Sequence, residues 1–65
     1  MDTIPIPAAV GKPAMRALAA NGYLTLDQLV LIEEADLLQM HGVGPKAIKV
    51  LKQAFVENNL PAAML

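Results

Sequence analysis

The chain has 65 residues, no cysteine and a net charge of −1, and 55% of its residues are hydrophobic. This length allows one small domain, the lack of cysteine excludes a disulfide framework or a Cys-based zinc site, and the charge counts against a strongly basic nucleic-acid binder. No apolar run approaches the roughly 20 residues of a membrane span, and the N-terminus lacks the pattern of a signal peptide. We therefore expect a cytoplasmic protein with no membrane partner.

The first part of the chain predicts an extended arm followed by a helix. Residues 1–8 contain two prolines, each of which pushes the residue before it away from helical geometry. We expect Ile4 and Ile6 of this arm to lie on the core. A helix should begin near Pro13, because proline suits the first helical turn, and it should end at Asn21-Gly22, where glycine supplies a left-handed conformation.

The middle and end of the chain predict further helices. Thr25 and Gln28 have the spacing of a capping box, so a helix should start at Leu26. Residues 32–34 either continue this helix or break it. A short helix should then bury three apolar residues: Leu37, Leu38 and Met40. The longest helix is expected over residues 45–58, where apolar residues recur at helical spacing.

These elements together predict the fold class. No segment alternates cleanly enough between apolar and polar residues to be a strand, so we expect a small compact all-α domain of four or five short helices. Both aromatic residues, Tyr23 and Phe55, occupy apolar helical positions, and we assign them to the core together with Met15 and Met40.

The sequence contains no recognisable combination of catalytic residues. Carboxylates are close together only at Glu33, Glu34 and Asp36, and no histidine or cysteine accompanies them. The chain has no serine, and its one histidine, His41, has no obvious nucleophile to activate. We interpret His41 as a surface residue that can add positive charge when protonated. The sequence thus predicts a protein that is not an enzyme and has no metal, cofactor or small-molecule substrate.

Two stretches, residues 9–18 and 42–51, repeat one another at an offset of 33 residues. Each places a glycine and free backbone N–H groups at a helix start, where hydrogen bonding and the helix dipole both favour an anion. All five basic residues fall in the two repeat helices: Lys12, Arg16, Lys46, Lys49 and Lys52. A repeated anion site suggests a ligand with repeated phosphates, and nucleic acid is the leading candidate.

Residues 37–51 resemble the helix-hairpin-helix family. They contain an apolar helix end, a Gly-apolar-Gly hairpin at Gly42, Val43 and Gly44, and a helix with a small residue and a basic face. The resemblance extends over about residues 8–60 and implies two such motifs, the first degenerate because Ala9 replaces its leading glycine. The implied organisation is an arm over residues 1–8, a tandem helix-hairpin-helix domain over residues 9–60 and a tail over residues 61–65.

The string from Met15 to Leu38 is similar to the C-terminal domain of the bacterial RNA polymerase alpha subunit, in which the first helix and the second hairpin grip DNA. The resemblance implies contacts at Arg16, Gly44 and Lys46. Pro13 stands where that domain has its principal arginine, which argues for general backbone binding over recognition of promoter elements.

We therefore expect a module that binds the phosphate backbone of double-stranded DNA with little sequence preference. Its candidate contacts are Gly42, Val43, Gly44, Lys46, Lys49, Arg16, Lys12 and Gly11. The alternative is a protein-interaction adaptor of the same fold, with a partner from the transcription or DNA-repair machinery or a second copy of itself. The acidic net charge and the apolar residues 60–65 favour this alternative.

Overall fold

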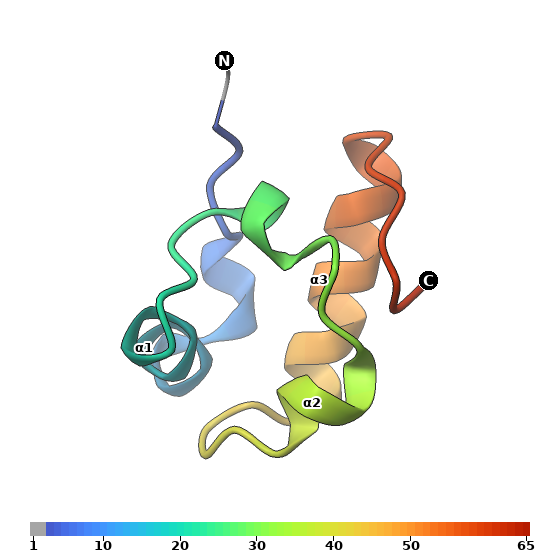
Figure 1. Cartoon of the computed structure of the whole chain (residues 1–65). Coiled ribbons are helices and arrows are strands. Elements are labelled where there is room, and N and C mark those ends of the chain that lie inside the picture. Colours follow the sequence, from blue (N-terminus) through green and yellow to red (C-terminus); the bar gives the residue numbers. More distant parts are fainter. Residues whose placement is uncertain (1–2) are drawn as a thin grey trace.

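The computed structural model describes residues 3–65 and contains three α-helices and two 3-10 turns (Figure 1). The elements in chain order are η1 (Ala8–Val10), α1 (Lys12–Ala20), η2 (Leu26–Leu29), α2 (Glu34–Leu38) and α3 (Pro45–Glu57). Residues 3–65 form no strand, although Pro5 and Thr25 make one isolated antiparallel bridge. The prediction of a small all-α domain is confirmed.

The two longer helices begin and end where local residue types predict. Pro13 and Pro45 each lie in a first turn, where the missing N–H has no helical partner to lose. At the other end, Asn21 and Asn58 each donate a side-chain amide hydrogen bond of 2.8 Å to a carbonyl four residues earlier. Gly22 then takes a φ of 86°, which a glycine adopts without strain.

The predicted helix at Leu26 begins there, but it is the short 3-10 turn η2. Gln28 Oε1 accepts the backbone N–H groups of Leu24 at 2.7 Å and Thr25 at 3.3 Å, so the glutamine half of the capping box forms. The Val30 carbonyl accepts the N–H of Ala63 at 2.8 Å. This carbonyl is therefore bonded to the C-terminal tail, and helical structure is interrupted between η2 and α2.

One core draws on every part of the molecule. Its largest fully buried side chains are Leu18, Leu26, Leu29, Leu37, Leu51 and Phe55. Ile6 of the arm and Met64 of the tail belong to the same core, and Ile4 packs against it. Met64 of the tail therefore packs into the core, whereas Leu65 is 57% exposed, so only part of the apolar residues 60–65 remains on the surface.

Two residues predicted to be buried are exposed. The prediction for Met15 is wrong, because 36% of its surface is exposed, and so is that for Leu38, at 42%. Each follows a buried residue, Ala14 or Leu37, on a short helix, and a step of one residue turns a side chain by about 100°. Such short helices bury only a narrow face. Tyr23 and Met40 are half-buried against the core.

Within residues 3–65, none of the helices has the length and apolar character needed to cross a membrane.

Candidate nucleic-acid interface

The hairpin between α2 and α3 is anchored from both sides. Val43, one of the candidate contacts, is buried, and its N–H donates to the Met40 carbonyl at 3.1 Å, so neither its side chain nor its amide is free to bind a phosphate. Gly42 has a φ of 98°, and a Cβ added there would lie 2.7 Å from the carbonyl oxygen of Pro13. The glycine thus lets the hairpin backbone approach the start of α1 closely. This contact fixes the hairpin relative to α1.

The start of α3 offers free hydrogen-bond donors. Among the residues that the structure describes, the N–H groups of Gly44, Lys46 and Ala47 have no hydrogen-bond partner, and Pro45 has no N–H. The first helical bond runs from the Ile48 N–H to the Gly44 carbonyl at 3.2 Å. A Cβ added at Gly44 would meet no atom within 4 Å, so the space beside the Gly44 amide is open, whereas Ala47 is buried. This end of the helix favours an anion.

The first repeat is built differently at the equivalent place. Gly11 has a φ of 94°, and its N–H donates to the Ala8 carbonyl at 3.0 Å, which closes η1. Its amide is therefore engaged within the protein, whereas that of Gly44 is free. Among the described residues only the N–H groups of Lys12 and Ala14 have no partner at the start of α1. The two repeats are thus unequal as anion sites.

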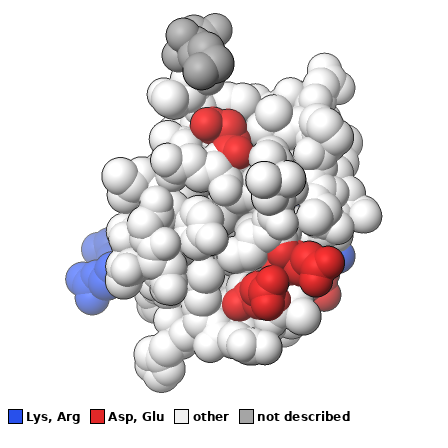
Figure 2. All heavy atoms as spheres, viewed as in Figure 1, with Lys and Arg blue, Asp and Glu red and all other residues white. Residues whose placement is uncertain are grey.

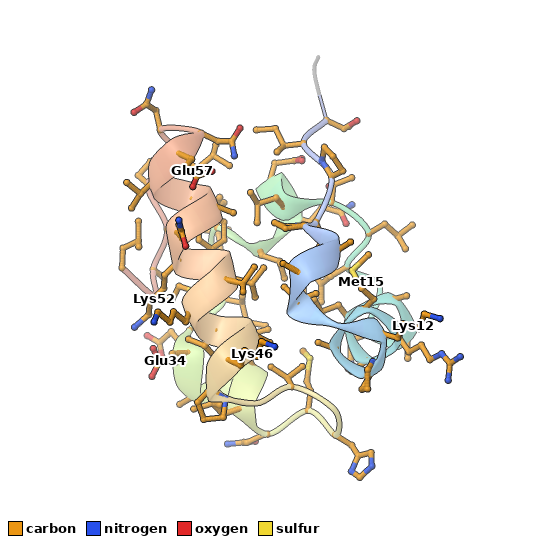
Figure 3. The ribbon with its side chains drawn as sticks, turned by 180° about the vertical axis from the view of Figure 1, so that it is seen from behind. Lys12, Met15, Glu34, Lys46, Lys52 and Glu57 are labelled. Atoms are coloured by element: carbon orange, nitrogen blue, oxygen red, sulfur yellow. The ribbon has the colours of Figure 1, made fainter. Side chains whose placement is uncertain are left out.

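The basic side chains form two groups, one near the hairpin and α1 and the other along the groove between α2 and α3. Figure 3 shows Lys46 at the hairpin end of α3 and Lys12 on α1, while Lys52 lies beside Glu34. Lys52 Nζ is 2.5 Å from Glu34 Oε1, so its charge is paired. Lys49 lines a groove between α2 and α3 together with that pair. Lys46 is therefore the candidate cation beside the free amides, and Lys49 lies nearer the acidic side.

Opposite charges are separated over the surface. On the face drawn in Figure 2, basic side chains lie mainly at one edge and acidic side chains form groups away from it. The exposed cations Lys12 and Arg16 both belong to α1. A surface of this kind presents a local positive field despite a net charge of −1.

Arg16 lies close to the hairpin. A shallow depression of ≈ 390 Å³ is lined by Pro13, Arg16, Ala17, His41 and Gly42. The helix and the hairpin are joined there by the contact between Gly42 and Pro13. His41 was not among the predicted contacts, and its place beside Arg16 follows from the packing of two segments far apart in the sequence.

The described part of the chain holds no group of three or more His, Asp or Glu side chains that could bind a metal ion. No protein-family model matches the sequence, and no curated protein or solved structure matches the chain. Function is therefore inferred from the geometry of the site.

Proposed function

We propose that this chain is a non-catalytic tandem helix-hairpin-helix module that binds the phosphate backbone of double-stranded DNA with little sequence preference. The observation that carries the proposal is the start of α3. Three backbone N–H groups without partners, at Gly44, Lys46 and Ala47, lie beside a glycine that has no side chain to block them. A phosphate oxygen is the kind of acceptor that such a helix start binds, and Lys46 adds charge.

Arg16 and Lys12 on α1 form the second half of the proposed interface. The contact between Gly42 and Pro13 holds α1 and the hairpin in a fixed relation, so both sets of donors can meet one rigid ligand. Contacts to phosphate from backbone amides and lysines position a duplex without distinguishing its bases. This chemistry supports binding without strong sequence preference.

An amide NMR titration with a short duplex of random sequence tests the proposal. At low salt we expect shifts at Gly44, Lys46 and Arg16, and these should disappear at high salt. Gly22, at the far end of α1, serves as an internal control, because its N–H already donates to the Ala19 carbonyl at 3.0 Å. Absence of any shift at low salt would rule out the phosphate-binding role.

A protein-interaction adaptor is the second candidate, favoured by one observation. A groove of ≈ 370 Å³ between α2 and α3 is lined by three apolar residues, Leu38, Pro45 and Ile48, with charged side chains at Glu34, Lys49 and Lys52. An exposed apolar surface of this kind suits a protein partner or a second copy. Sedimentation separates the candidates: a mass that rises with concentration supports self-association, and a salt-sensitive DNA complex supports the first proposal.

A further inference from the structure

The depression between α1 and the hairpin is lined by two basic side chains. Arg16 on α1 and His41 on the hairpin line it together, and the other lining residues are Pro13, Ala17 and Gly42. The lining therefore includes one permanent cation and one residue type that gains a positive charge between pH 5 and 8. We propose that this depression is a second phosphate subsite, and that a DNA phosphate bound there draws a proton onto His41.

The lining of the depression includes no acidic side chain to compete with a phosphate. None of the carboxylates of residues 3–65 lines it: Asp27, Glu33, Glu34, Asp36 and Glu57. Glu34 is paired with Lys52 in the other groove, and Glu57 lines a hollow beside Pro7 at the far end of α3. The other cations of the elements packed around the hairpin, Lys12, Lys46 and Lys49, do not line the depression either. Among the charged side chains, Arg16 is therefore the one that shares the lining with His41.

The backbone beside the two residues is closely packed. The Cα of Gly42 packs so closely on the Pro13 carbonyl that an added Cβ would be 2.7 Å from it, and His41 is the residue next to this contact. A phosphate bound between the two side chains favours the protonated imidazole. DNA binding should then be coupled to the uptake of one proton.

This inference rests on the proposed DNA binding, and its test uses the full chain with a short labelled duplex at constant ionic strength. Fluorescence anisotropy should show binding about two- to fivefold tighter near pH 6 than near pH 8, the range for one exposed ion pair. The His41→Gln variant should lose this pH dependence, and His41→Lys should bind at pH 8 as tightly as the parent does at pH 6. Lys52→Gln, which removes a cation from the other side of α3, should keep it.

A direct measurement follows the imidazole itself. His41 is the only histidine in the chain, so its NMR resonances report one site. The midpoint of its protonation should move to higher pH when the duplex is added. An unchanged midpoint, or a pH dependence that survives in His41→Gln, would overturn the subsite while leaving DNA binding intact. Absence of binding at both pH values would overturn the subsite and the proposed function together.

Discussion

Gly42 and Gly44 are two residues apart, yet the structure requires glycine at only one of them. Gly42 combines a φ of 98° with the close approach to the Pro13 carbonyl, so a side chain there meets both backbone strain and a steric clash. Gly44 has an extended φ of −122° and open space around it. Packing does not explain the second glycine, and the proposed access of a phosphate to the amides of α3 would require it.

Alanine at Gly42 should therefore reduce stability, whereas alanine at Gly44 should reduce DNA binding. Gly42→Ala should lower the free energy of unfolding by about 2–4 kcal/mol, from the strained φ and the overpacked contact. Gly44→Ala should change it by less than about 0.5 kcal/mol, as at an ordinary surface site, but should weaken DNA binding. Urea unfolding of both variants, with an anisotropy titration of Gly44→Ala, provides the measurement. A large loss of stability in Gly44→Ala would make this residue a structural requirement.

Asp27 ties the N-terminal arm to the rest of the domain. The N–H of Ile4 donates a 3.2 Å hydrogen bond to Asp27 Oδ1, and this bond is the main reason that the pKa of the carboxyl lies below its usual value near 3.8. A lowered pKa in the folded protein means that the ionised carboxylate stabilises the fold above about pH 4. That contribution is lost as the pH falls through the folded-state value.

Acid should therefore loosen this attachment. We expect the stability of the parent protein to fall more steeply below about pH 4 than that of Asp27→Asn, whose side chain cannot ionise. The difference between the two free energies of unfolding, followed by circular dichroism from neutral to acidic pH, isolates this residue from the other carboxylates. Parallel curves for parent and variant would contradict the role assigned to Asp27.

At the scale of elements, the C-terminal tail contributes to the fold more than its composition suggests. Ala63 is hydrogen-bonded to the carbonyl of Val30, and Met64 is 6% exposed, whereas Leu65 is 57% exposed. The tail therefore closes the core beside the break between η2 and α2. Two adjacent apolar residues at the chain end thus have different surroundings.

Truncating each of these side chains should reveal the difference. Met64→Ala should cost about 2–4 kcal/mol of stability, as for other buried methionines, while the matched Leu65→Ala should cost less than about 0.5 kcal/mol. Chemical denaturation of both variants measures the two values. Equal effects would mean that the tail does not pack as described.

At the scale of the whole molecule, charge distribution sets the strength of the proposed interaction. Glu34 pairs with Lys52, which leaves four exposed cations for DNA: Lys12, Arg16, Lys46 and Lys49. With about three to five phosphates engaged, affinity should be roughly micromolar or weaker, and log affinity should fall against log salt with a slope of about −3 to −4.

Replacing one central cation tests this estimate. Lys46→Glu should weaken binding by about tenfold at low salt and reduce the steepness of the salt dependence by about one. The effect should be similar for duplexes of unrelated sequence, because phosphates are common to all of them. Lys52→Gln is the matched control and should change affinity little. A loss confined to one duplex sequence would contradict backbone binding.

Signals within a few residues of one another were sufficient to predict much of this protein. Proline at a helix start, asparagine at a helix end and the hydrogen bond that the Thr25 N–H donates to Gln28 Oε1 all act within about one helical turn. The ends of α1 and α3 could therefore be predicted from the sequence. The helix type of η2 and the bounds of α2 could not, because the predicted helix at Leu26 is a 3-10 turn and α2 ends at Leu38, before Met40. The choice of the α3 start as an anion site stays a prediction.

Tertiary packing decided the remainder. It determined that Met15 and Leu38 are exposed, that Lys52 pairs with Glu34, and that Met64 enters the core. It also placed Gly42 against Pro13 and His41 beside Arg16. Each of these outcomes depends on which segments meet in space. Residue spacing along one helix determines which side chains share a face, but only the packing of the other segments determines what that face contacts.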